Sequence, residues 1–109
     1  MTSDLCEVVI TAADAEWLTR FTGRLVADRL AAAVHNLAPI SSTYWWEGEV
    51  QERHEARAML HTRVTLVPAI VERANRDHPY RVPCVVATPL ITGNPEYLDW
   101  IRAETADTP

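Results

Sequence analysis

The chain has 109 residues, of which 48% are hydrophobic and 23% charged, and its formal net charge is −5. This composition is that of one ordinary globular domain, so we predict a single domain over residues 1–109. The ten basic residues are all arginines scattered among acidic ones, which excludes a basic stripe for nucleic acid. No apolar run approaches the roughly 18 residues of a membrane span, so we expect neither a nucleic acid nor a membrane partner.

The first residues and the two cysteines both indicate the cytoplasm. The sequence starts Met-Thr-Ser-Asp-Leu-Cys, which is acidic and lacks the apolar core of a signal peptide. Cys6 and Cys84 stand far apart and outside any paired-cysteine motif, as is typical of free thiols in a reducing compartment. We therefore expect a cytoplasmic protein without a disulfide.

The first part of the chain predicts a strand followed by a helix. Residues 5–11 are short, β-branched and apolar, as in a buried strand. Asp14 is a suitable N-cap, and an apolar face at three- and four-residue spacing continues to about Leu30. Gly23 interrupts this helix at a cost of about 1 kcal/mol relative to Ala, so we expect the helix to approach the sheet closely there.

The segment from Ile40 to Val64 predicts a long hairpin. It begins with β-branched, hydroxylated and aromatic residues, turns around Gly48, and ends in an alternation of apolar and polar side chains. Residues 49–60 are also rich in helix formers with one apolar helical face, so periodicity alone leaves a helix open there. Pro39, just before the hairpin, fits an edge strand or a bulge.

The last third of the chain predicts a helix, a strand and a short helix. Thr65 is expected to cap the first of these, which ends before Pro79 because a residue preceding proline leaves the helical region. Residues 82–92 hold two prolines and therefore fit an edge strand. An Asn-Pro pair at 94–95 begins the final helix. Residues from about 104 to 109 are expected to form a frayed tail.

This order of elements predicts an α+β fold, the ferredoxin-like β-α-β-β-α-β sandwich, with a long hairpin between its second and third strands and a short C-terminal helix. The helices of such a fold cover one face of the sheet and leave the other open. A two-stranded aromatic ribbon is marginal alone. Tyr44, Trp45 and Trp46 are therefore predicted to bury against further copies of the chain.

Several spaced signatures resemble the CutA divalent-cation-tolerance family along nearly the whole chain. They are weak singly and specific in this order: Leu30-Ala31-Ala32, Tyr44-Trp45-Trp46-Glu47-Gly48, Leu60-His61-Thr62, His78-Pro79-Tyr80-Arg81-Val82-Pro83, Pro89-Leu90, Gly93 and Tyr97-Leu98-Asp99-Trp100-Ile101. The resemblance implies a ferredoxin-like protomer, a homotrimer with interlocked hairpins, and a role in divalent-cation (copper) tolerance without a defined catalytic activity. It also favours the strand over the helix at residues 49–60.

Candidate metal ligands arise where the sequence departs from the pattern of that family. His61 stands where a lysine is usual, Cys84 where a glutamate is usual, and Ala33 where a cysteine is usual. Thiolate and imidazole suit copper or zinc, so His61, His78 and Cys84 are candidate ligands of a site shared between subunits. The alternative is that they are satisfied polar residues at a subunit boundary, because no two histidines stand at metal-binding spacing.

An enzymatic function finds no support in the motifs. No nucleophile elbow, phosphate loop or dinucleotide fingerprint occurs, so we expect no enzyme. A second hypothesis is a trimeric effector-binding module similar in fold to the nitrogen-regulatory PII family, although fold does not establish function. Its ligand cleft between subunits would be lined by Glu55, His61, His78, Tyr80 and Trp100.

Overall fold

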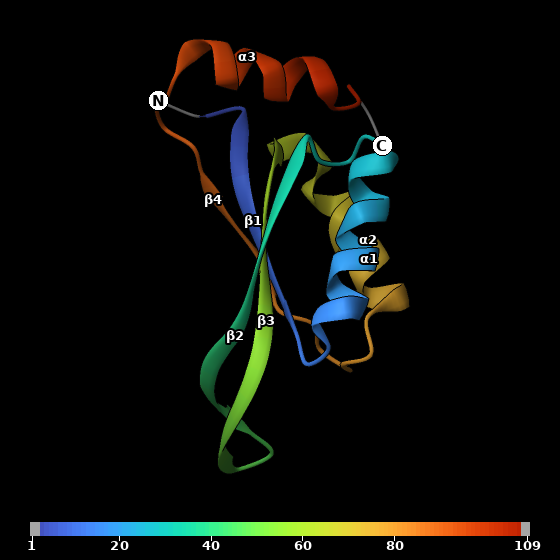
Figure 1. The fold of residues 1–109 in the computed structure, drawn as a ribbon, viewed down its shortest axis with the longest axis vertical. Helices are drawn as coiled ribbons and strands as arrows, with labels where there is room; N and C mark the ends of the chain where they lie inside the picture. Colours follow the sequence, from blue (N-terminus) through green and yellow to red (C-terminus); the bar gives the residue numbers. More distant parts are fainter. Residues whose placement is uncertain (1–2, 108–109) are drawn as a thin grey trace.

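Four strands, three α-helices and one short 3-10 helix make up residues 3–107, the part of the chain that the computed structural model describes. In chain order they are β1 (Leu5–Ala12), α1 (Ala15–Ala27), β2 (Ala33–Trp46), β3 (Glu49–Arg63), the 3-10 helix η1 (Val64–Leu66), α2 (Val67–Asp77), β4 (Val85–Pro89) and α3 (Pro95–Glu104). The strands form one antiparallel sheet in the order β2-β3-β1-β4. This is the predicted ferredoxin-like α+β fold (Figure 1).

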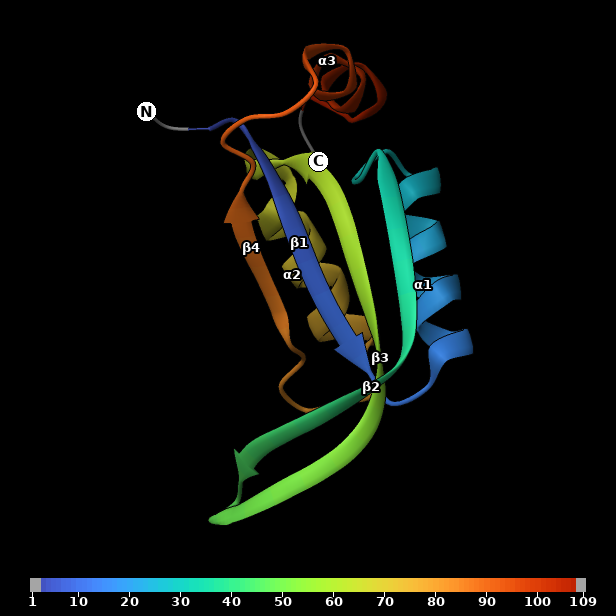
Figure 2. The same ribbon diagram turned by 60° about the vertical axis from the view of Figure 1, so that its left-hand side comes forward.

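Helices α1 and α2 lie on one face of the sheet, and α3 crosses one end of it (Figures 1 and 2). The helices cover the face to which the even-numbered side chains of β1 point. From Cys6 to Ala12 these side chains are at most 1% exposed, so they form the sheet's contribution to the core. The helices complete this core with Leu18, Phe21, Leu25 and Ile70. None of the helices within residues 3–107 is long and apolar enough to cross a membrane.

Helix α1 begins at the predicted residue, but Gly23 does not lie on its sheet-facing side as expected. The Asp14 carboxylate accepts hydrogen bonds from the N–H groups of Glu16 and Trp17 at 2.9 and 3.2 Å, which confirms the N-cap. The helix ends at Ala27, earlier than expected. The expectation for Gly23 is wrong: this residue is exposed, and a Cβ there would meet no atom within 4 Å, because Gly23 faces solvent instead of the sheet.

The long hairpin is confirmed and exceeds its predicted length, because β2 begins at Ala33 and β3 ends at Arg63. Glu47 (φ 50°) and Gly48 (φ 79°) both adopt the left-handed backbone that a tight two-residue turn requires. Residues 49–60 are strand. The helical alternative is excluded because each of these residues pairs in register with β2 or β1.

Prolines mark the two edges of the sheet. Pro39 lies in the edge strand β2, whose register with β3 shifts between Leu37 and Ile40, as expected for a bulge. The other edge strand, β4, is shorter than the predicted range 82–92. Prolines lack the N–H group that a longer ladder would need, and Pro83 lies just before β4.

The start of α2 differs from the prediction, whereas its end and the start of α3 agree with it. Thr65 lies in η1 and gives α2 no side-chain cap, because the chain coils into a 3-10 turn one residue earlier. Helix α2 ends at Asp77, before Pro79, as expected. The side chain of Asn94 accepts a hydrogen bond from the Glu96 N–H at 3.1 Å and caps α3.

The frayed tail predicted from about residue 104 is wrong for its first residues. Thr105 is only 6% exposed, and its hydroxyl donates to the carbonyl oxygen of Ile101 at 2.8 Å. The same hydroxyl accepts from Arg63 Nε at 3.0 Å, and the Ala106 N–H donates to the Arg29 carbonyl at 2.9 Å. These contacts tie the chain end to β3 and to the segment after α1. Residues 108 and 109 of the predicted tail lie outside the described residues.

Candidate functional site

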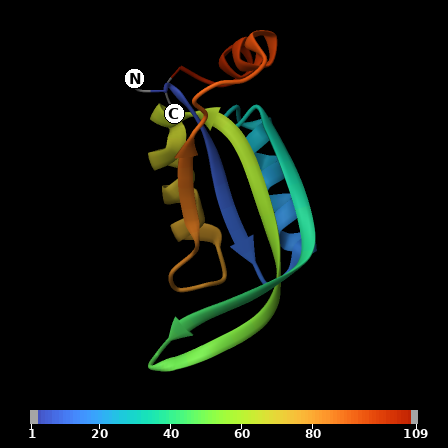
Figure 3. The same ribbon diagram turned by 90° about the vertical axis from the view of Figure 1, so that its left-hand side faces the viewer.

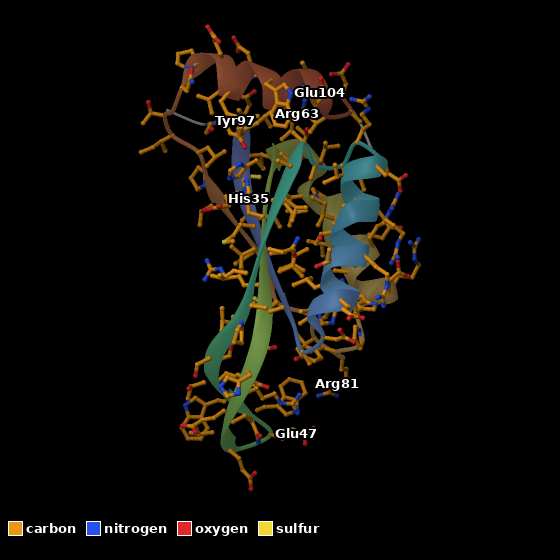
Figure 4. All side chains as sticks on the ribbon, in the orientation of Figure 1. His35, Glu47, Arg63, Arg81, Tyr97 and Glu104 are labelled. Carbon is orange, nitrogen blue, oxygen red and sulfur yellow. The ribbon has the colours of Figure 1, made fainter. Side chains whose placement is uncertain are left out.

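His61 lies at the α3 end of the sheet, in what we call the α3-end cluster (Glu7, His61, Tyr97 and Trp100). Strand pairing places Glu7 opposite His61. Helix α3 carries Tyr97 (Figure 4), whose ring contacts the ring of His61 edge-on. The His61 Nδ1 lies 2.6 Å from the Tyr97 hydroxyl, and its Nε2 lies 3.3 Å from a Glu7 carboxylate oxygen. Tyr97 stacks on Trp100 with ring centroids 5.6 Å apart. Burial, and then the charge of Glu7, raise the pKa of Tyr97.

Glu55, His78 and Tyr80 form a second group, which we call the hairpin-end cluster. The His78 Nε2 donates to the carbonyl oxygen of Thr11 at 2.8 Å, and its Nδ1 accepts from the Tyr80 N–H at 3.0 Å. The Tyr80 hydroxyl donates to the Glu55 carboxylate at 2.7 Å. Glu55 and His78 are each 6% exposed. This is a buried network in which the polar groups satisfy one another.

The two clusters lie at opposite ends of β1. The α3-end cluster meets this strand at Glu7 and the hairpin-end cluster meets it at Thr11, which is roughly 13 Å further along a strand. Within one chain, the residues predicted for the inter-subunit cleft are therefore separated into two groups. His61 and Trp100 lie at one end, and Glu55, His78 and Tyr80 lie at the other. The five residues could line one cleft only if the α3 end of one chain met the hairpin end of another. The cleft between subunits therefore stays a prediction.

The candidate metal ligands do not form a metal site within one chain. Residues 3–107 hold no group of three or more His, Cys, Asp or Glu side chains placed to bind a metal ion. His61 and His78 each use both ring nitrogens in the contacts described above, so a metal would cost each histidine a hydrogen bond. The donor types suit copper or zinc, but their arrangement within a single chain does not fit either ion.

The two cysteines are free thiols in contrasting surroundings. Cys6 is 1% exposed in β1, and burial raises the pKa of its thiol to about 11. This thiol is therefore protonated and unreactive at neutral pH. Cys84 is exposed and lies just before β4, so it is the accessible thiol of the described chain.

The aromatic residues of the hairpin point to two sides, because side chains alternate along a strand. Trp45 is 74% exposed and pairs across the ribbon with Val50, which is 53% exposed. Tyr44 and Trp46 point to the other side and line a hollow. Of the three residues predicted as interface anchors, Trp45 therefore lies with Val50 on a bare apolar face of the hairpin. Tyr44 and Trp46 lie on its concave face.

The hollow has a volume of about 540 Å³ and lies between the hairpin and the segment that leads into β4. Its walls carry aromatic and charged side chains, namely Tyr44, Trp46, Arg53, Glu55, Tyr80 and Arg81. The sequence motifs include several of these residues, Arg81 among them, but not Arg53. A signal for Arg53 exists in the hairpin register, which pairs it with Ser42 on the face that holds Tyr44.

Comparison with known proteins identifies the family. The family model described as CutA1 divalent ion tolerance protein matches residues 6–104. The chain belongs to this family. The divalent-cation tolerance protein CutA of Thermus thermophilus is 41% identical to it over 100 residues, which cover 91% of this chain and 97% of that relative. The resemblance to CutA proteins predicted from the motifs is thereby confirmed.

Solved CutA1 structures have the same fold. The crystal structure of CutA1 from Oryza sativa superposes with a TM-score of 0.92 at 36% identity, covering 98% of both chains. The CutA1 structure from Thermus thermophilus gives a TM-score of 0.90 at 39% identity, covering 94% of this chain and 99% of that one.

Some CutA relatives are longer or bear names that state a compartment. The rice protein named as chloroplastic CutA 1 is 37% identical over 101 residues, and the chain spans 57% of its length. A structure from Archaeoglobus fulgidus is named a periplasmic divalent cation tolerance protein. Family membership therefore leaves the compartment of this chain open.

Proposed function

We propose that this chain forms a homotrimer that serves in divalent-cation tolerance, without catalytic chemistry of its own. The bare apolar face of the hairpin carries this proposal. Trp45 and Val50 lie there side by side, 74% and 53% exposed, outside the helix-covered core. An aromatic ribbon of this kind is stable in water when another chain covers it. The names of the CutA relatives refer to divalent-cation tolerance and to no reaction.

The uncovered face of the sheet supports the same assembly. Below α3 no helix of residues 3–107 covers this face (Figure 3). Leu37 and Val86 lie on it, 53% and 56% exposed. Strand register places them on the side opposite the core, with Leu37 across from Arg57 and Val86 across from Val9. Burial of the hairpin and the sheet face together would supply the large apolar interface of a permanent oligomer, and the CutA resemblance indicates three copies.

Sedimentation of the Trp45→Ala variant tests the assembly. We expect the wild-type chain to sediment at three times its 12.3 kDa mass. The variant should dissociate at concentrations about 30-fold higher, because a central aromatic anchor is worth about 2 kcal/mol or more. Glu52→Ala, an exposed change nearby in β3, is the matched control and should leave the assembly unchanged. A well-folded wild-type single subunit at micromolar concentration would contradict the proposal.

We further propose that copper or zinc is bound between chains. The three candidate ligands support this, because His61 and His78 lie at opposite ends of one chain and Cys84 is an exposed thiol. Side chains from two chains are needed to gather the three or four ligands that these ions prefer.

Calorimetric titration with each metal tests this site. We expect stoichiometric binding by the wild-type chain and its loss when His78→Ala and Cys84→Ser are combined. His54→Ala, which removes an exposed histidine of the hairpin, is the control and should bind as the wild type does. Binding of neither metal above the background of the double variant would refute the metal site.

A trimeric effector-binding module is the second candidate function, and the hollow beside the hairpin favours it. The hollow has the size of a small-molecule site and holds both charged and aromatic side chains.

We also propose a cytoplasmic location, supported by the two free thiols. Fractionation of cells that express the chain, with a tagged copy followed by immunoblotting, would test that location.

A further inference from the structure

Helix α3 packs against the rest of the chain unequally along its length. Toward its C-terminal end Ile101 is 0% exposed, and Thr105, just after the helix, is 6% exposed. Residues 91–96, at the other end, are all exposed, and Ile91 is 82% exposed. Burial of apolar surface, which holds a helix against its sheet, therefore acts mainly at the C-terminal end.

Two arginines from different elements clamp that C-terminal end (Figure 4). The Arg63 guanidinium, at the end of β3, donates to the carbonyl oxygen of Arg102 at 2.6 Å and to the Thr105 hydroxyl at 3.0 Å. Arg29, which follows α1, donates to the Glu104 carboxylate at 2.6 Å. Cations are favourable at this end of a helix, where the last carbonyl groups lack partners. The clamp therefore supplies donors that the last turn needs.

The backbone of Arg29 is strained in a way that serves the clamp. Its φ of 64° is the left-handed conformation that ends many helices and that glycine usually occupies. A larger residue keeps such a conformation where the surrounding contacts hold it there. The Arg29 carbonyl accepts from the Ala106 N–H at 2.9 Å, and its guanidinium holds Glu104. Both contacts attach the end of the described chain to the turn after α1.

The N-terminal half of α3 is tied to the sheet by one hydrogen bond among residues 3–107. The Tyr97 hydroxyl lies 2.6 Å from His61 Nδ1, and the two rings meet edge-on. Residues 91–94, which lead into the helix, form no hydrogen bond with the sheet in this part of the chain. Before them, the Leu90 N–H donates to the Leu5 carbonyl at 3.0 Å. The segment 91–94 can therefore change conformation without breaking the sheet.

We propose that α3 is a strap that lifts at its N-terminal end while its C-terminal end stays clamped. Residues 91–94 supply the slack, and lifting breaks the contact between Tyr97 and His61. The His61 side chain, which is 17% exposed with the strap in place, then becomes more accessible, and its Nδ1 is free for a ligand. This consequence for His61 rests on the ligand role proposed for it above, whereas the motion itself does not.

Hydrogen exchange of the backbone amides, followed by NMR, tests the motion. A helix at the end of a chain usually frays from that end, and the strap predicts the opposite. After correction for intrinsic rates, the Asp99 amide should exchange about tenfold or more faster than the Ala106 amide, whose hydrogen bond to Arg29 belongs to the clamp. Equal rates at the two amides, or faster exchange at Ala106, would overturn the proposal.

Variants at the two ends of α3 separate the strap from the clamp. Tyr97→Phe removes the hydroxyl that ties the N-terminal half, so it should speed exchange at Asp99 about threefold or more and leave Ala106 unchanged. Arg29→Gln should speed exchange at Ala106 and leave Asp99 unchanged. Arg76→Gln, which removes an exposed ion pair of α2, is the control and should change neither amide.

The same variants can contradict the strap. The proposal is overturned if Tyr97→Phe leaves Asp99 unchanged, or if either end variant speeds exchange at Asp99 and Ala106 equally, because α3 then opens as one rigid unit. The exchange measurement uses no metal, so its failure is distinct from failure of the metal titration.

Discussion

Strand β3 passes through two environments along one continuous backbone. In its C-terminal half the inward side chains lie under α1 and α2, and Leu60 is 0% exposed. Toward the turn the ribbon has no helix over it (Figure 1), and Val50 is 53% exposed. Apolar burial drives folding in proportion to the area removed from water. The covered half therefore stabilises the chain, whereas the free half presents its side chains to other molecules.

The largest effect should come from the covered half. Leu60→Ala should lower the free energy of unfolding by about 2–5 kcal/mol, because it leaves a cavity in a closely packed core. Urea unfolding followed by circular dichroism measures this loss. Trp45→Ala is the matched change in the free half, and the secondary structure of its dissociated subunit should remain intact. If Trp45→Ala lowered the free energy of unfolding of the subunit as much as Leu60→Ala does, the contrast between the covered and free halves of β3 would be contradicted.

An intermediate effect is expected at the junction of the two halves. Tyr80→Phe should cost about 1–3 kcal/mol, because it leaves the Glu55 carboxylate without the Tyr80 hydroxyl. Glu55 is 6% exposed, so water does not readily replace that donor. Urea unfolding of Tyr80→Phe measures the cost. Tyr44→Phe, on the neighbouring hairpin wall, is the control, and an equal loss in that variant would show that the Glu55 contact is not special.

The same tyrosine predicts a pH dependence at the alkaline end. Burial, and then the hydrogen bond to Glu55, raise the pKa of Tyr80 from 10.0 to about 12. A raised pKa in the folded chain contributes stability that is fully present below pH 10.0 and is lost as the pH rises toward about 12. Ultraviolet absorbance should show a phenolate titration near pH 12 in the wild type that is lost in Tyr80→Phe, whereas the raised pKa of Tyr97 remains in both. Titration of all tyrosines together near pH 10.0 would contradict this assignment.

The smallest effect should come from an exposed ion pair at the far end of the covered half. Arg102 Nε donates to the Asp4 carboxylate at 2.8 Å, and this contact lowers the pKa of Asp4 below 3.8. A lowered pKa contributes stability above pH 3.8 that is lost as the pH falls through the folded-state value. Arg102→Gln should raise the Asp4 pKa toward its ordinary value, measured by NMR titration. Arg20→Gln, which removes a different exposed ion pair, is the control and should leave Asp4 unchanged.

Local rules predicted those elements that depend on one or two residues. Asp14 caps α1, since its side chain alone supplies the acceptor that the first turn needs. Pro39 marks an edge strand because a missing N–H cannot be tolerated inside the sheet. Thr65 was predicted by the same logic and is not a cap, because the chain coils into η1 there and α2 begins after Leu66. A suitable residue type does not establish the position at which a helix starts.

The candidate site was less predictable because it depends on contacts far apart in the sequence. His61 and His78 were grouped from their chemistry, yet strand pairing and the exit of α2 place them at opposite ends of β1. Arg53 of β3 and Arg81 line the same hollow only because the hairpin bends beneath the loop before β4. No spacing along the chain encodes that bend, which arises where β2 and β3 extend past the helices.

The sequence by itself determined the order of the elements, the edge strands, the aromatic hairpin and the CutA family, since alternation, capping, proline chemistry and spaced signatures are properties of neighbouring residues. Only the tertiary structure decided which histidines share a neighbourhood, which face of the hairpin stays bare, and which side chains meet in the hollow beside the hairpin. These outcomes follow from strand register and from the limited reach of two helices over a longer ribbon. Such constraints act through space, so they become visible only when the chain has folded.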